Sequence, residues 1–245
     1  MGNGAKSSLF KGFKDHTTKL SNFTIDVNSA RRFNIDLISH NNSYSNLNKT
    51  ELHERLNKSL DTVNRLYTMI GMDPNDLPDL EIHYNRYSAT AYGDAVIDLY
   101  GKKTAELNLY AEMFLDKNYD TGAHEVTHGL EAWFIKTQYK SVSDQANAWS
   151  NHLFSEGICR NALVAIGEQS ASKIDLDRIA WKKNADTIKL NKYDNYASSA
   201  PCETVTRAVQ DVLRKGSSAS DYSKAILQQL KLEVKRNYEI KKSKI

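Results

Sequence analysis

Apolar residues recur at helical spacing from residue 48 onward and predict a long N-terminal helix. The stripe that carries this prediction consists of Leu52, Leu56, Leu60, Val63 and Ile70. Asn48 can cap the first turn, Glu51 stands in the capping-box position, and Gly71 ends the run. Residues 1–47 show little periodicity, so we expect a loose segment before the helix.

A second kind of pattern, with a period of two, predicts short strands after this helix. Residues 80–84 indicate one strand, and residues 95–100 and 104–110 indicate two more. The last two runs are separated by Gly101-Lys102-Lys103, a length and composition that favour a β-hairpin.

Everything beyond the hairpin is helical in pattern. The predicted helices are 121–138, 144–168, 175–188, 201–215 and 219–240. The order of helix, small sheet and further helices predicts an α+β class. We expect three parts: an N-terminal segment over residues 1–79, partly disordered and then helical; a main domain over residues 80–240; and a basic tail over residues 241–245.

Composition narrows the class of protein only slightly. The formal net charge is +3, and the basic residues near both ends favour solvated termini over nucleic-acid binding. The two cysteines, Cys159 and Cys202, have no spacing typical of a disulfide framework or a metal-binding pair. No apolar run approaches a membrane span and no apolar leader stands at the N-terminus, so we expect a cytoplasmic protein without a membrane partner.

The strongest chemical pattern lies in the predicted helix 121–138, in the segment His124-Glu125-Val126-Thr127-His128. Histidines four residues apart on a helix lie on one face, where both imidazoles can bind one Zn²⁺. Glu125 is placed to act as general base toward a water molecule on the metal. The alternative is an amphipathic helix with two surface histidines and no metal.

A catalytic zinc site needs a third protein ligand, and two glutamates are candidates. Glu156 lies 28 residues after His128, and Glu203 lies 75 residues after it. Spacing slightly favours Glu156, whereas local sequence favours Glu203, because Pro201 places Glu203 near a helix start. We interpret Glu131 as a surface or supporting carboxylate, and His83 and His152 as residues that do not bind the metal.

The segment from Tyr196 to Ala208 resembles the third-ligand region of the anthrax-lethal-factor type of zinc peptidase, in which a Tyr precedes the ligand Glu by seven residues. The run from His124 to about Lys224 is also similar to metallopeptidase domains of phage and prophage head-associated proteins, whereas residues 1–79 lie outside the resemblance. The resemblance implies a zincin-like fold, one Zn²⁺ held by His124, His128 and Glu203, and catalytic roles for Glu125 and Tyr196.

One position departs from the family pattern. An acidic residue usually follows the ligand Glu by one helical turn and supports the first histidine, but Arg207 stands there. A cation close to the metal would oppose zinc binding unless it turns outward or Asp211 compensates for it.

The function expected from these residues is a zinc-dependent endopeptidase that binds a polypeptide substrate in extended conformation. The resemblance adds a phage or prophage association, with a virion or host protein as partner. Two alternatives stay open. The first is a structural or interaction protein of a virion or head assembly with weak or no catalysis, which Arg207 favours. The second is a toxin or effector that cuts a host protein.

Overall fold

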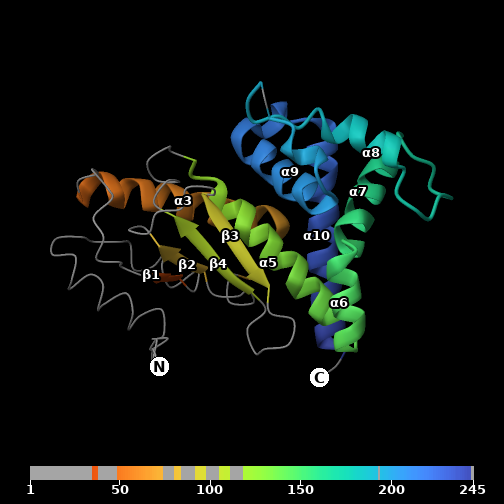
Figure 1. The fold of residues 1–245 in the computed structure, drawn as a ribbon, viewed down its shortest axis with the longest axis horizontal. Helices are drawn as coiled ribbons and strands as arrows, with labels where there is room; N and C mark the ends of the chain where they lie inside the picture. The colour runs from red at the N-terminus through yellow and green to blue at the C-terminus, as the bar shows by residue number, and fades with distance from the viewer. Residues whose placement is uncertain are drawn as a thin grey trace. The chain divides into compact units, whose positions relative to one another are not determined.

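The computed structural model describes residues 35–37, 49–73, 80–83, 92–97, 105–110, 118–192 and 194–243 (Figure 1). The chain forms two compact units. The first unit comprises Met1–Asn64, Asp73–Asp98 and Lys102–Gly129; the second comprises Arg65–Met72, Leu99–Gly101 and Leu130–Ile245. The predicted N-terminal segment 1–48 lies outside the described residues apart from 35–37. In the described part of the chain, no helix is both long and apolar enough to cross a membrane.

Four short strands belong to the first unit: β1 (Ile35–Leu37), β2 (Leu80–His83), β3 (Gly93–Ile97) and β4 (Ala105–Tyr110). They are ordered β1-β2-β4-β3, with β1, β2 and β4 parallel and β3 antiparallel to β4. The strand predicted over residues 95–100 instead occupies Gly93–Ile97, and the predicted loop Gly101-Lys102-Lys103 lies outside the described residues.

The described chain is mostly helical, and the predicted α+β class with a zincin-like small sheet is therefore wrong. Its strands contain only three to six residues, whereas its helices are up to 22 residues long. The alternating runs predict strands at nearly the observed places, but helices make up most of the described chain. Short strands beside long helices therefore do not decide the class.

Three helices agree closely with the predicted ranges: α3 (Lys49–Ile70), α5 (Thr121–Gln138) and α9 (Pro201–Lys215). Gly71, just beyond α3, has a φ of +72°, a conformation that glycine adopts without strain.

The predicted single helix over residues 144–168 is wrong. Two helices, α6 (Val142–Ser150) and α7 (Leu153–Ala165), take its place. They are separated at His152, whose φ of +52° lies in the left-handed region and interrupts the helical path.

Two further helices begin at side-chain caps. Asp177 accepts hydrogen bonds from the backbone N–H groups of the first turn of α8 (Arg178–Ala185). Ser220 likewise accepts from the N–H of Ser223 at the start of α10 (Asp221–Lys242). These caps satisfy backbone donors that have no partner within the helix, so each polar residue sets where its helix begins.

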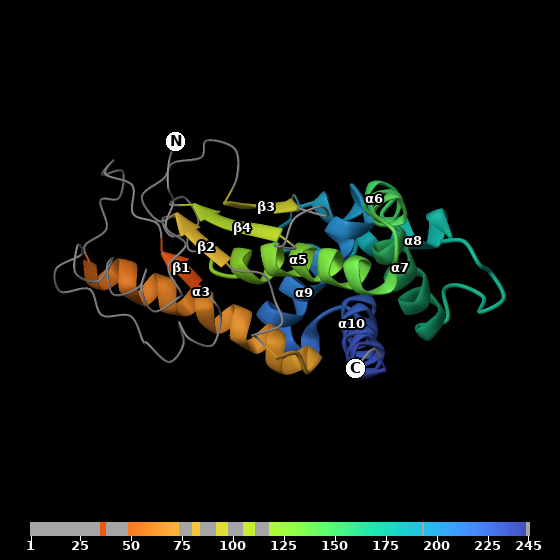
Figure 2. The ribbon, with the colours of Figure 1, turned by 90° about the horizontal axis from the view of Figure 1, so that it is seen from below.

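The core of the second unit lies where α10 packs against both α7 and α9 (Figures 1 and 2). Tyr222 of α10 is buried there, and its hydroxyl donates to the carbonyl oxygen of Cys159 at 3.4 Å. Phe134 of α5 stacks on Phe154 of α7 with ring centroids 4.5 Å apart. Helix-on-helix packing of this kind holds α9, the helix that carries Glu203, in place.

A buried carboxylate joins the end of α9 to the start of α10. Asp211 Oδ2 accepts hydrogen bonds from Ser220 N at 3.0 Å and Ser223 Oγ at 2.7 Å, and Lys215 Nζ lies 2.7 Å from Oδ1. Burial opposes ionisation of Asp211, but the hydrogen bonds from Lys215, Ser223 and Ser220 hold its pKa below the ordinary value.

We predict that Asp211→Asn lowers the free energy of unfolding by about 1–3 kcal/mol at neutral pH, because the amide cannot replace a charged acceptor of three donors. The folded-state pKa of Asp211 is depressed, so its contribution is present above pH ~4 and is lost as the pH falls through the folded pKa. Urea unfolding at several pH values should therefore show that the free energies of unfolding of wild type and Asp211→Asn become equal in acid. The exposed Asp175→Asn variant is the control. A difference in free energy of unfolding between wild type and Asp211→Asn that stays constant down to pH 2 would contradict a depressed pKa for Asp211.

Candidate metal centre

Helix α5 presents two imidazoles one turn apart. Its first turn follows a tight turn in which Thr121 N donates to Asn118 O and His124 N donates to Asp120 O, both at 3.1 Å. The rings of His124 and His128 are 5.0 Å apart between centroids and nearly perpendicular. His124 is only 8% exposed and His128 is half-buried, so the alternative of two freely exposed surface histidines does not describe them.

The opposite side of α5 is apolar, which fixes the side on which the imidazoles stand. Val126 and Leu130 are fully buried, and Trp133 is nearly so. Glu125 follows His124 directly and is 5% exposed. A carboxylate buried beside an imidazole is expensive to desolvate unless charged or polar groups compensate, which is typical of a functional position.

Glu203 lies in the first turn of α9, as the sequence predicted. Pro201 occupies the first helical turn, where its missing N–H costs nothing, and Ala200 before it is extended. Thr206 Oγ1 donates to Glu203 O at 3.1 Å and lies 3.4 Å from its carboxylate Oε2. The carboxylate is therefore carried on the ordered start of a helix and not on a free loop.

Thr204 ties this helix start to its neighbours through one buried hydroxyl. Its Oγ1 donates to Ala197 O at 2.6 Å and accepts the indole N–H of Trp181 at 2.9 Å. Ala197 belongs to the short 3₁₀ turn η2 (Tyr196–Ser198), and Trp181 belongs to α8. One side chain thus fixes the residue next to Glu203 and the turn that begins with Tyr196.

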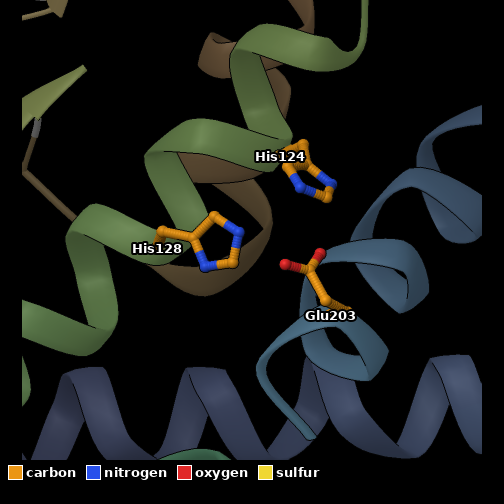
Figure 3. A group of neighbouring side chains, drawn as sticks. All are labelled: His124, His128 and Glu203. Atoms are coloured by element: carbon orange, nitrogen blue, oxygen red, sulfur yellow. The ribbon is translucent and has the colours of Figure 1, made fainter. Parts of the chain in front are cut away.

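Among the described residues, one group of three or more potential ligands meets the spacing of a metal site: His124, His128 and Glu203 (Figure 3). One ligand atom from each lies within 4.8 Å of the other two. Ligand atoms at about 2.0–2.2 Å from a tetrahedral zinc stand about 3.4 Å apart. Two imidazole nitrogens and one carboxylate oxygen also form a ligand set that zinc accepts, with a fourth position left for water.

The competing ligand candidate, Glu156, is not part of this group. It lies in the first turn of α7, where it forms an ion pair and hydrogen bond with Arg178. His152 is the left-handed residue before α7 and is also outside the group. The side chain of His83 lies outside the described residues.

Tyr196 stands at the start of η2 and is 45% exposed. Its backbone N–H donates to Asp194 Oδ1 at 3.0 Å. The guanidinium of Arg207 lies over its ring, with 4.9 Å from Cζ to the ring centroid. Two residues of α9, Arg207 and Thr204, therefore connect this helix to the turn of Tyr196.

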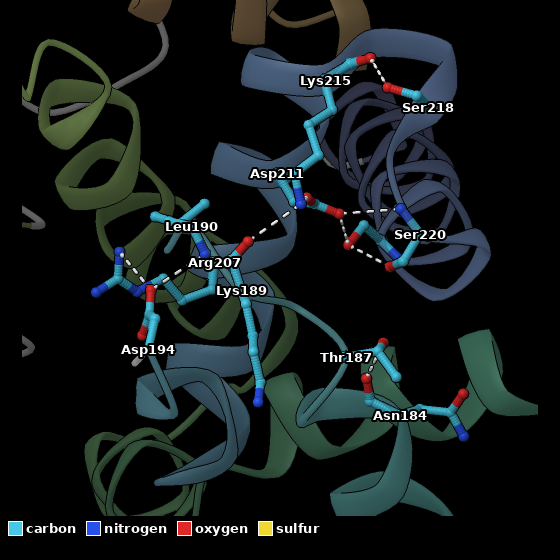
Figure 4. A network of polar contacts seen from close by, with 11 residues as sticks. Asn184, Thr187, Lys189, Leu190, Asp194, Arg207, Asp211, Lys215, Ser218 and Ser220 are labelled. Atoms are coloured by element: carbon cyan, nitrogen blue, oxygen red, sulfur yellow. Dashed lines mark hydrogen bonds and ion pairs between the residues drawn. The ribbon is translucent and has the colours of Figure 1, made fainter. Parts of the chain in front are cut away.

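Arg207, one helical turn after Glu203, is held by two polar side chains. Its Nη1 lies 3.7 Å from Asp194 Oδ2 (Figure 4). The same nitrogen donates to Gln210 Oε1 at 3.0 Å. Asp211 does not compensate for this cation, because its oxygens are occupied by Lys215, Ser220 and Ser223. The charge of Arg207 is balanced by Asp194 instead.

Glu131 is buried and lies outside the ligand group, so of its two predicted roles the surface one is wrong and the supporting one stays a prediction. It accepts a hydrogen bond from Ser155 Oγ at 2.7 Å. Burial raises the pKa of its carboxyl to about 7, with Ser155 opposing the rise and Glu203 adding to it.

The two cysteines behave as packed residues without a disulfide. Burial raises the pKa of the Cys202 thiol to about 12, with the carboxylates of Glu131 and Glu203 adding to the rise. Burial likewise raises the pKa of Cys159 to about 12. A thiol of this kind stays protonated at neutral pH, so neither cysteine is primed as a nucleophile.

No protein-family model, curated protein or solved structure matches this chain. The family likeness seen in the segments around His124 and Glu203 therefore stays a prediction.

We predict that Glu131→Gln changes how the stability of the metal-free protein depends on pH. Because the folded-state pKa is raised from 4.5 to about 7, the unfolded chain releases this proton first. Wild-type stability should then decline as the pH rises from about 4.5 to 7 and level off above, whereas Gln stays neutral throughout.

Between pH 4.5 and 7, the free energy of unfolding of the variant should therefore rise relative to that of the wild type by up to about 3 kcal/mol, since one pKa unit corresponds to about 1.4 kcal/mol. Urea unfolding at pH 5, 6, 7 and 8 measures this gain, with Glu168→Gln at a solvent-facing ion pair as the control. Parallel pH profiles for wild type and Glu131→Gln would refute a raised pKa.

Proposed function

We propose that this chain is a zinc-dependent endopeptidase whose metal is held by His124, His128 and Glu203. The observation that carries the proposal is the convergence of these three side chains, with one ligand atom of each within 4.8 Å of the others. The sequence spacing supports it further, because the two histidines enclose a glutamate directly after the first ligand, as in the zinc-peptidase motif.

Zinc bound there would polarise a substrate carbonyl and lower the pKa of a water molecule to about 7. Glu125 is the residue we assign as general base. Its carboxylate would accept a proton from the attacking water and deliver it to the amide nitrogen that leaves. The burial of Glu125 supports this role, since low solvent access keeps the carboxylate from being screened by bulk water.

Tyr196 is assigned, on the family resemblance, to donate a hydrogen bond to the oxyanion that develops on the substrate. Its position supports the assignment, because Thr204 fixes the turn of Tyr196 to the helix start that carries Glu203. The substrate would be a polypeptide in extended conformation. A virion or host protein is the partner that the phage-like resemblance implies.

A second candidate is a virion or head-assembly component with weak or no catalysis. Arg207 is the observation that favours it, because it replaces the acidic residue that supports the first histidine in the family. The two candidates differ in whether the protein hydrolyses a mixed peptide library when it contains zinc.

We predict about one zinc per wild-type chain and much weaker zinc binding in Glu203→Ala. Glu156→Ala is the matched control, because it removes a carboxylate that is paired with Arg178 and lies outside the ligand group. Elemental analysis after dialysis against a weak chelator measures the zinc content per chain. Loss of zinc in Glu156→Ala but not in Glu203→Ala would reverse the ligand assignment.

We also predict that Glu125→Gln retains zinc and thermal stability but loses peptide hydrolysis by roughly a thousandfold or more. Glutamine has the size of glutamate but cannot accept the proton. Cleavage of a peptide library, followed by mass spectrometry, provides the readout. Near-wild-type turnover in this variant would exclude Glu125 as the base.

A further inference from the structure

Arg207 contacts Tyr196 in a way that the family resemblance does not anticipate, and the contact suggests a role for the arginine. Its guanidinium carbon lies 4.9 Å from the centroid of the Tyr196 ring, within the range of a cation–π interaction. Tyr196 is 45% exposed, and the guanidinium of Arg207 lies over one face of its ring.

The arginine is itself held in place by groups that restrict its orientation. Asp194 Oδ2 lies 3.7 Å from its Nη1 (Figure 4). Gln210 Oε1 accepts from the same nitrogen at 3.0 Å. Gln210 and Asp194 are both buried, so these anchors are not loose surface contacts. A planar guanidinium fixed at its edge presents its face to the ring.

Asp194 links this arrangement to the backbone of Tyr196. Its Oδ1 accepts from Tyr196 N at 3.0 Å, and its Oδ2 lies 3.4 Å from Leu190 N. The same carboxylate therefore fixes the main chain of Tyr196 and the cation above its ring. Backbone and ring of this tyrosine are held from two sides by one ion pair.

The Nε–H of Arg207 is buried without a hydrogen-bond partner among the described residues. An unsatisfied buried donor costs free energy, so the anchored position of Arg207 is not one that satisfies all of its donors.

We propose that Arg207, anchored by Asp194 and Gln210, is a positioning residue that holds the Tyr196 ring in the orientation needed to donate its hydrogen bond during peptide hydrolysis. The proposal rests on the proposed function. Pre-orienting a donor removes the rotational freedom that would otherwise be lost in the transition state. Arg207 thereby takes a new role in place of the acidic residue of the family.

The kinetic test is a double-mutant cycle between Arg207→Met and Tyr196→Phe in the zinc-loaded protein. Methionine keeps an apolar stem but removes the charge. We expect Arg207→Met to lower kcat roughly tenfold with little change in KM, and to have less than about a twofold effect when Phe replaces Tyr196. Equal losses in both backgrounds would show that Arg207 acts on the fold alone and would overturn the proposal.

A second readout uses the metal-free protein labelled with 3-fluorotyrosine. The ¹⁹F resonance of Tyr196 is identified by its absence in Tyr196→Phe. Arg207→Met should move it toward the position of free fluorotyrosine, and Arg207→Lys should move it less, because an ammonium still attracts the ring face. The control is Arg178→Met, which removes a different arginine, 5.6 Å from the Trp181 ring, and should leave this resonance unchanged.

The two readouts separate the proposals. An unmoved resonance in Arg207→Met overturns the positioning role, whatever the enzyme does. A moved resonance in a protein that binds zinc but cleaves no peptide overturns the proposed function, and with it any catalytic purpose for the contact. A moved resonance together with a coupled loss of kcat supports both.

Discussion

The hydroxyl of Thr204 is the interaction on which the second half of the candidate site depends. It joins the start of α9 to η2 by donating to Ala197 O, and to α8 by accepting from Trp181. Because it is fully buried, its two partners have no water with which to replace it. Glu203 precedes it by one residue and Tyr196 begins the turn that it holds, so both candidate site residues take their positions from one hydrogen-bonded side chain.

Charge supplies the second constraint. Glu125 and Glu131 are buried and Glu203 is half-buried, although carboxylates are costly to remove from water. The pKa of Glu131 is raised because burial removes its carboxylate from water. Arg207 is the nearby cation on α9, but it is held by Asp194. A divalent cation bound by His124, His128 and Glu203 would offset the accumulated negative charge, which is the electrostatic argument for a metal at this position.

Sequence reasoning succeeded where a local signal decides the structure. Pro201 and the basic last turn predicted the span of α9, and the spacing of His124 and His128 predicted one shared helix face. It failed where the deciding contacts are distant or the signal is ambiguous. No glycine or proline in the sequence indicates the left-handed residue His152, which separates α6 from α7. Short alternating runs indicate strands but not the class, because the observed strands contain only three to six residues and helices make up most of the described chain.

The contacts of Arg207 could not be predicted either. Tyr196 lies eleven residues before it and Asp194 thirteen, and only the fold of η2 against α9 brings the three together. A sequence pattern can show that an acidic residue has been replaced, but the partner that balances the new charge depends on tertiary structure. The burial of Glu131 likewise depends on tertiary structure, because a helix stripe of two histidines and a glutamate is polar and predicts exposure to solvent.

The central claim is that one metal ion is bound by His124, His128 and Glu203. The most direct test is a crystal structure of the zinc-loaded protein with anomalous diffraction measured on both sides of the zinc absorption edge. The account predicts a single anomalous peak at about 2.0–2.2 Å from one nitrogen of each histidine and one oxygen of Glu203. A peak coordinated by Glu156 or His152, or no peak near α5 at full zinc occupancy elsewhere, would contradict it.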